Sequence, residues 1–277
     1  PPVEAPADRI PGFLAWRAGA VVDQKQDGFV AVYVRLQHGE LTSANMRGLA
    51  SILGRFGDGS LRVTIDQNAL LSWVHQKSLP ALYEALSELG LTKSGVHTAR
   101  DVVACPGAES CNLAVTSSRA LGAAITERLE KDDARELAAS VDTAIKISGC
   151  PNSCGQHHVA DIGFHGGAKT FGGLTVPVYQ LHLGGGVDER GARFGKQVVK
   201  IIARRVPDAV VLLMKLYETD RKESERPRQF FQRVDPKRVT ATLASLAGPP
   251  EAQAHEAIDI GETQGFVIDT KEGECAA

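Results

Sequence analysis

Residues 105–111 have the sequence C-P-G-A-E-S-C, and residues 149–155 have the sequence G-C-P-N-S-C-G. Four of the five cysteines of this 277-residue chain lie in these two segments: Cys105 and Cys111 in the first cysteine loop (105–111), Cys150 and Cys154 in the second cysteine loop (149–155). The 38 residues between Cys111 and Cys150 are enough for a helix and a return strand that bring the loops together. The spacing predicts that four thiolates meet around one small inorganic group.

Zinc and iron-sulfur clusters both accept four thiolates. Structural zinc sites usually take tight loops with two to four residues between the cysteines, whereas five residues separate Cys105 from Cys111. A cubane cluster is larger than one ion and accepts this wider loop. The spacing therefore favours an iron-sulfur cluster over zinc, with buried or redox-active cysteines as the third alternative.

The residues around the cysteines add a family resemblance. C-P-G-A-E-S-C-N-L-A (105–114), I-S-G-C-P-N-S-C-G-Q (147–156) and A-D-I-G-F-H-G (160–166) resemble the siroheme and 4Fe-4S binding region of assimilatory nitrite and sulfite reductases. The resemblance implies that Cys105, Cys111, Cys150 and Cys154 hold a 4Fe-4S cluster. It also implies that Cys154 bridges the cluster to the siroheme iron as its axial ligand, which gives a short electron path between the two cofactors.

The order of predicted elements favours an α+β fold, with a ferredoxin-like α/β module followed by a mixed-sheet siroheme/4Fe-4S domain. We expect an extended, proline-rich N-terminal arm at 1–15, the module at 16–95, the cluster domain at 96–248 and an acidic tail at 249–277. The resemblance covers about residues 16–250 and matches the C-terminal, cluster-bearing half of the family's enzymes.

In the module, alternating apolar residues predict strands at 28–36 and 61–65. Thr42 or Ser43 is expected to cap a helix that ends at about Phe56, and Ser78 and Pro80 to open a second helix that ends near Gly90. The predicted apolar faces of these helices consist of Met46, Leu49, Ile52 and Leu53, and of Leu79, Leu82, Leu86 and Leu89.

In the cluster domain, residues 112–129 have a strongly helical composition, which would place Cys111 near a helix N-terminus. A strand at 143–148 is expected to run into the second cysteine loop, where Pro151 and Gly155 set tight turns. Further strands are predicted at 159–164 and 176–183, and helices at 194–206, 209–221 and 236–247.

Other candidate site residues carry weaker signals. L-R-V-T-I-D-Q-N (61–68) resembles the strand that faces siroheme in the family, which makes Gln67 and Asn68 candidates for cofactor binding; the alternative is an exposed strand end. Asn152 is a candidate to hydrogen-bond a cluster sulfur, and turn formation explains it equally well. His157 and His158 are expected to be surface residues or residues behind the ligands, and Cys275 an exposed free thiol. No catalytic residue is assigned.

Composition limits the alternatives further. No apolar run of about 18 residues exists, so we expect no membrane span and a cytoplasmic location. The pI near 6.5 and the lack of a basic, aromatic motif argue against nucleic-acid binding. No flavin or nicotinamide fingerprint is present, so we expect the electrons to come from another protein. The cations between Lys196 and Arg233 are expected to form a basic helical surface that binds an acidic, ferredoxin-like donor.

The leading hypothesis is a siroheme/4Fe-4S oxidoreductase component for six-electron reduction of nitrite to ammonia or sulfite to sulfide. The alternatives are an electron-transfer or cofactor-carrying subunit without reductase activity, and a zinc-stabilised nucleic-acid-binding protein. The resemblance implies that full enzymes contain module and domain twice, whereas this sequence contains each once. We therefore expect half of a catalytic unit, completed by a partner chain or a homodimer, and Pro1 in place of methionine fits a cut or a gene boundary.

Overall fold

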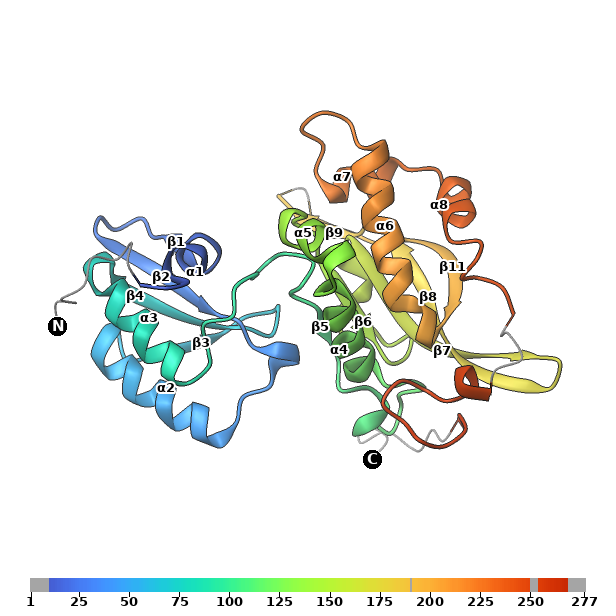
Figure 1. The fold of residues 1–277 in the computed structure, drawn as a ribbon, viewed down its shortest axis with the longest axis horizontal. Coiled ribbons are helices and arrows are strands. Elements are labelled where there is room, and N and C mark those ends of the chain that lie inside the picture. The colour runs from blue at the N-terminus through green and yellow to red at the C-terminus, as the bar shows by residue number, and fades with distance from the viewer. Residues whose placement is uncertain (1–9, 190, 250–253, 269–277) are drawn as a thin grey trace. The chain divides into compact units, whose positions relative to one another are not determined.

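The computed structural model describes residues 10–189, 191–249 and 254–268. Two compact units make up the chain, Pro1–Val96 and His97–Ala277, and each has its own hydrophobic core (Figure 1). Both units combine helices with a sheet, so the predicted α+β class is confirmed. No helix in the described ranges is both long and apolar enough to cross a membrane.

The first unit packs its helices against a four-stranded antiparallel sheet of order β1-β2-β4-β3. The Thr42 hydroxyl caps α2 by accepting a hydrogen bond from the Asn45 backbone N–H at 3.1 Å, as the sequence predicts. The elements are α1 (Phe13–Ala20), β1 (Val21–Asp23), β2 (Phe29–Val34), α2 (Ser43–Phe56), β3 (Leu61–Val63), β4 (Ala69–His75) and α3 (Leu79–Glu88), with 3₁₀ turns at Gln37–Gly39 and Gln76–Ser78.

Two predictions for this unit are wrong. Residues 13–15 belong to helix α1 and not to an extended arm, because Phe13 and Trp16 are large aromatic residues that the core buries. Met46 does not belong to the apolar face of α2: its side chain is 58% exposed, whereas Leu49, Ile52 and Leu53 are buried. Residues 1–9 of the predicted arm lie outside the described residues.

The second unit is built on a five-stranded mixed sheet of order β11-β8-β7-β6-β5. Strands β5, β6 and β7 run parallel to one another, and β8 and β11 continue the sheet in antiparallel pairs. The elements are β5 (Val103–Ala104), α4 (Ser118–Leu129), α5 (Asp132–Ser140), β6 (Ile145–Ser148), β7 (Ile162–Phe171), β8 (Leu174–Leu183), β9 (Gly186–Asp188), β10 (Gly191–Arg193), β11 (Lys196–Ile202), α6 (Val206–Asp220), α7 (Pro227–Arg233) and α8 (Pro236–Thr242), with 3₁₀ turns at Gly107–Glu109, His157–Val159, Ala203–Arg205 and Ala254–Ala257.

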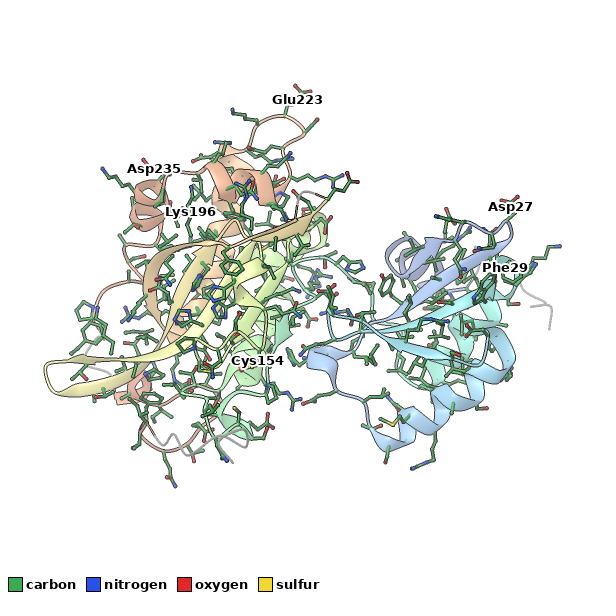
Figure 2. All side chains as sticks on the ribbon, turned by 180° about the vertical axis from the view of Figure 1, so that it is seen from behind. Asp27, Phe29, Cys154, Lys196, Glu223 and Asp235 are labelled. Carbon is green, nitrogen blue, oxygen red and sulfur yellow. The ribbon has the colours of Figure 1, made fainter. Side chains whose placement is uncertain are left out.

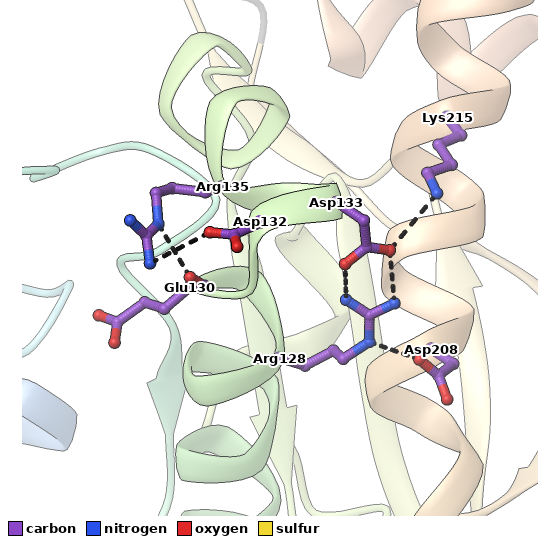
Figure 3. Close-up of polar contacts among 7 residues, drawn as sticks. All are labelled: Arg128, Glu130, Asp132, Asp133, Arg135, Asp208 and Lys215. Carbon is purple, nitrogen blue, oxygen red and sulfur yellow. Dashed lines mark hydrogen bonds and ion pairs between the residues drawn. The ribbon is translucent and has the colours of Figure 1, made fainter.

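Helices α4, α5 and α6 pack over one face of this sheet (Figure 1). At the outer side of this helix layer, the Arg128 guanidinium of α4 donates hydrogen bonds to both carboxylate oxygens of Asp133 in α5, at 2.8 and 3.0 Å, and also bonds Asp208 in α6 (Figure 3). These contacts, with the Arg128 hydrogen bond as the main cause, hold the pKa of the Asp133 carboxyl below its usual value. One arginine therefore ties three helices together.

The predicted helix at 194–206 is wrong, because Lys196–Ile202 forms strand β11. This strand, which is rich in β-branched residues, pairs with β8, and the helix starts only at Val206. The predicted helix at 236–247 is shorter and ends at Thr242. The predicted strand at 159–164 starts late, at Ile162, because His157–Val159 forms a 3₁₀ turn before it.

Candidate cluster site

Both cysteine loops start where a parallel strand ends. Strand β5 ends at Ala104, directly before Cys105, and β6 ends at Ser148, two residues before Cys150. Because β5 and β6 are parallel neighbours, with Ala104 paired to Ile147, both loops leave the same edge of the sheet. The carboxyl edge of parallel strands is where α/β folds place their ligands.

The first cysteine loop is closed by backbone contacts. Gly107 has a φ of +67°, and a Cβ there would lie 2.5 Å from the Ser118 nitrogen, so only glycine fits. The carbonyl of Gly107 accepts the Cys111 N–H at 3.0 Å. The turn therefore fixes the backbone of Cys111 while its side chain stays exposed.

The prediction that Cys111 lies at a helix N-terminus is wrong. Helix α4 begins at Ser118, because the N–H groups of Val115 and Thr116 donate to the Gly149 carbonyl at 2.9 and 3.1 Å instead of starting a helix. These two bonds link the segment after the first cysteine loop to the second cysteine loop. It is Cys105 that contacts the start of α4, since the Ser118 hydroxyl lies 3.2 Å from its Sγ and 2.8 Å from its carbonyl oxygen.

The second cysteine loop depends on two glycines that leave no room for a side chain. A Cβ on Gly155 would lie 1.9 Å from the Ile147 carbonyl oxygen, and one on Gly149 would lie 2.6 Å from the Thr116 carbonyl oxygen. The Gly155 N–H donates to the Ser148 hydroxyl at 3.1 Å. The chain therefore turns back tightly on the end of β6 between Cys150 and Cys154.

Backbone N–H groups point at two of the sulfurs. The Gly149 N–H donates to Cys105 Sγ at 3.2 Å. Burial raises the pKa of the Cys150 thiol, a hydrogen bond from the Asn152 backbone opposes this, and the charges of Cys105, Cys111 and Cys154 raise the pKa further. The Cys150 sulfur is thus close enough to the other three for their thiolate charges to act on it, and a cationic group among them would stabilise the charged forms.

The ligand set fits a cluster better than a single zinc ion. Of the histidine, cysteine and acidic side chains in the described ranges, one group of three has its ligand atoms at single-ion spacing, and that group consists of histidines. The four cysteines form no such group. Four thiolates on two loops with a wider spacing suit a cubane, whose edges separate the sulfurs more than one ion does.

The remaining candidates have definite places. Asn68, buried between β3 and β4, accepts the Leu36 N–H on its side-chain oxygen at 2.9 Å, and Gln67 precedes it with a φ of 60°. Both belong to the first unit, and their role toward a cofactor stays a prediction. Asn152 is exposed and acts on Cys150 through its backbone. Cys275 lies outside the described residues.

Sequence reasoning missed Ser118 and Ser148. Each serine hydroxyl supports one cysteine loop, Ser118 at Cys105 and Ser148 at the Gly155 N–H. The sequence gives a faint signal for Ser148 alone, since it directly precedes the second loop. Ser118 is seven residues past Cys111, where only the fold reveals its contact.

Geometry and sequence together define a protein class: a two-unit α+β protein whose two cysteine loops leave the same edge of a mixed sheet. The family model described as the nitrite/sulfite reductase ferredoxin-like half domain matches residues 22–89. The model described as the nitrite and sulphite reductase 4Fe-4S domain matches residues 95–247, more than half of the chain. The chain therefore belongs to the nitrite/sulfite reductase family, and the cofactors of that family are a 4Fe-4S cluster and siroheme.

Individual relatives agree with this assignment. The chain is 32% identical over 194 residues to a ferredoxin–nitrite reductase of Synechococcus elongatus, covering 69% of this chain and 36% of the relative. It is 29% identical over 221 residues to a sulfite reductase [ferredoxin] of Mycobacterium tuberculosis, covering 77% of this chain and 39% of the relative. The solved NirA protein of Mycobacterium tuberculosis superposes with a TM-score of 0.70 and 26% identity over 86% of this chain and 42% of that one. The chain thus spans well under half the length of these relatives.

Proposed function

We propose that this chain is the cluster-bearing half of a siroheme/4Fe-4S oxidoreductase that carries out the overall six-electron reduction of nitrite to ammonia or of sulfite to sulfide. The observation that carries the proposal is the convergence of four cysteines on two loops at one sheet edge, within the unit that matches the family's 4Fe-4S domain. Relatives named as ferredoxin–nitrite reductase and sulfite reductase [ferredoxin] support both anions as substrates and a ferredoxin as electron donor. We place the reaction in the cytoplasm, where thiolate ligands stay reduced.

Cys105, Cys111, Cys150 and Cys154 are the residues that would hold the cluster, and Cys154 would also be the axial ligand of siroheme. Cys154 is exposed, which leaves room for a second cofactor beside it. Together the two groups supply electron storage and the iron at which the anion is reduced. The protein's own contribution is to orient the sulfurs and to stabilise their charge through backbone N–H groups, such as that of Gly149, which donates to Cys105 Sγ.

The proposed catalytic unit needs a second half. The resemblance implies that cations clamping the substrate anion come mainly from the half that these 277 residues do not match. On the corresponding strand of the first unit, the Arg62 guanidinium is engaged by the Asp58 carboxylate at 2.9 Å. A bound anion therefore needs charge and protons from elsewhere, and we propose a partner chain or a second copy as their source.

We also propose that an acidic ferredoxin docks on the larger unit through exposed cations. The predicted basic region is helical only in part, because Lys196 and Lys200 lie on strand β11 whereas Lys215 lies on α6. Arg205 is excluded from docking by its buried pairing with Glu256. Exposed residues such as Lys200 and Lys222 remain for steering a donor, whose association should weaken steeply with salt.

The cofactor assignment is tested by loading the full chain with siroheme and iron-sulfur cluster and recording optical and electron paramagnetic resonance spectra. Wild type should show siroheme bands, cluster absorption and magnetic coupling between the two. Cys154→Ser should lose the coupling, whereas Cys275→Ser should keep both cofactors. A Cys154→Ser protein with a fully coupled spectrum, or a colourless wild type that binds only zinc, would contradict the assignment.

The half-enzyme proposal is tested by assaying the loaded chain as an isolated monomer, with excess reduced donor and with each anion in turn. We expect cofactor spectra without sustained six-electron turnover. Turnover at the rate of a full-length relative by the monomer would overturn the need for a second half, and it would leave the cofactor assignment intact.

A further inference from the structure

Three histidines from separate elements meet behind the second cysteine loop. His157 comes from the 3₁₀ turn His157–Val159, His165 from β7 and His182 from β8. Their ring centroids lie 4.8–5.0 Å apart in all three pairs. In the described part of the chain this is the group whose ligand atoms, one from each residue, all lie within 4.8 Å of one another.

Strand register brings two of them together. Gly163 pairs with His182 and His165 pairs with Gln180 across the antiparallel β7–β8 ladder, so the two histidines are diagonal neighbours on one face of the sheet. Their Nδ1 (His165) and Nε2 (His182) atoms are 2.8 Å apart and share a hydrogen bond. Two nitrogen ligands of one tetrahedral zinc ion are separated by about 3.3 Å, from Zn–N distances of about 2.0–2.1 Å. A small widening of this pair would therefore admit an ion.

His157 completes the group from above the sheet. Gly163 permits its approach, since a Cβ there would lie 2.0 Å from the His157 carbonyl oxygen. Its Nδ1 lies 2.8 Å from the Ser148 hydroxyl, which fixes the ring. The side chain is fully buried, and its Nε2 atom has no hydrogen-bond partner. An unpaired buried polar atom is costly, by about 1–3 kcal/mol, unless something binds it.

We propose that His157, His165 and His182 form a binding site for a divalent transition-metal ion such as Zn²⁺. Three imidazoles are a ligand set that zinc takes in proteins, and a ring nitrogen that hydrogen-bonds a serine orients the ligand as known metal sites do. In the bound form the Nδ1–H of His157 donates to Ser148, so its Nε2 lone pair faces the metal. His158, whose ring centroid is 4.1 Å from that of His157, is the nearest side chain for a fourth ligand.

The environment favours neutral imidazoles, which are the metal-binding forms. Burial, together with the charges of the neighbouring histidines, lowers the pKa of His157 to about 3 and that of His182 to about 4. Lys200 is a positive charge near His165 and repels a cation, so the site has to select the metal by ligand type and not by net charge. This site goes beyond the proposed reductase function and uses none of the cysteines.

The test uses the full chain with its iron-sulfur cluster already loaded, so that iron fills the cysteine site. The protein is incubated with ZnSO₄ and desalted, zinc and iron are counted separately, and X-ray absorption is recorded at the zinc edge. We expect one zinc per chain with nitrogen ligands at about 2.0–2.1 Å and no sulfur at about 2.3 Å. Sulfur in the zinc shell, or no retained zinc, would overturn the proposal.

Variants locate the site. His182→Gln and the half-buried His165→Gln should each lower zinc retention at least tenfold with unchanged iron content. His255→Gln, at an exposed histidine on the 3₁₀ turn Ala254–Ala257, is the matched control and should keep zinc. Equal zinc retention by His165→Gln and His255→Gln would refute the site. Failure to load iron contradicts the proposed function, and the loss of nitrogen-bound zinc in His165→Gln relative to His255→Gln then still tests the histidine site.

Discussion

Removing the Arg205–Glu256 ion pair should destabilise the larger unit strongly and leave the smaller unit unaffected. The Arg205 guanidinium donates to both Glu256 carboxylate oxygens, at 2.6 and 2.8 Å, and the two side chains are only 12% and 8% exposed. The same guanidinium donates to the carbonyls of Leu246, Gly248 and Pro249. It thus holds the 3₁₀ turn Ala254–Ala257 and the segment after α8 against the start of α6.

The magnitude follows from burial. Breaking a buried ion pair by removing one partner costs about 3–5 kcal/mol, because the other charge stays buried without compensation. The free-energy cost of Arg205→Met should lie at the upper end of this range, because this substitution also removes the donors to three carbonyls. The cost of Glu256→Met should lie at the lower end. The double variant should be no less stable than Arg205→Met, because no charge is left behind.

Urea unfolding of the reduced, metal-free protein measures this loss of stability. With a slope of about 2 kcal/mol/M, the midpoint of the larger unit should fall by about 1.5–2.5 M. Both tryptophans of the chain, Trp16 and Trp73, belong to the first unit, so their fluorescence is an internal control while circular dichroism follows both units. Single variants that shift the midpoint by less than about 0.3 M, or a double variant that adds the two single costs, would refute this reasoning.

Three further predictions follow from single contacts. Gly155→Ala should lower iron incorporation at least tenfold, because its Cβ would lie 1.9 Å from the Ile147 carbonyl oxygen. Gly167→Ala, which has open space around the position, is the control and should load iron normally. Equal iron content in the two variants would contradict the prediction. Arg128 lowers the pKa of the Asp133 carboxyl from 3.8, so this ion pair stabilises the folded protein above that pH and loses its effect as the pH falls. The difference in melting temperature between wild type and Arg128→Met should therefore be smaller at about pH 3 than at about pH 6. A difference that does not change with pH would be the contrary result. Donor-dependent reduction should slow steeply with added salt, and indifference to salt would rule out electrostatic docking.

Local signals predicted the parts of the fold that local chemistry determines. Helix α2 begins where Thr42 predicts it, because an N-cap hydroxyl satisfies a backbone N–H regardless of the rest of the chain. The strand before the second cysteine loop was predicted at 143–148 and is β6, and the mixed sheet is confirmed, whereas the short strand β5 before the first loop was not predicted. The four proposed cluster ligands lie within two short segments, so the sequence alone is enough to propose them.

Elements whose identity depends on a distant partner were predicted wrongly. Residues 196–202 include Val198, Val199, Ile201 and Ile202, and an apolar run of this length fits a buried helix or a strand equally. Pairing with β8 makes it a strand, and that pairing is invisible in the sequence. The segment after Cys111 shows the same effect, because the Gly149 carbonyl accepts N–H groups that a helix would otherwise use.

The histidine group shows why part of a site can escape sequence reasoning altogether. His165 and His182 become neighbours through the β7–β8 register, and His157 joins them because Gly163 lacks a side chain. The Ser148 hydroxyl then connects this group to the cluster site, since it contacts both His157 Nδ1, at 2.8 Å, and the Gly155 N–H, at 3.1 Å. The end of β6 is thus shared by the two proposed sites: the loop that follows it carries Cys150 and Cys154, and its last side chain, Ser148, contacts the His157 ring. An ion bound by the histidines would consequently restrain the turn that places Cys154. A zinc site, which has no redox chemistry of its own, could in this way influence the proposed cluster site.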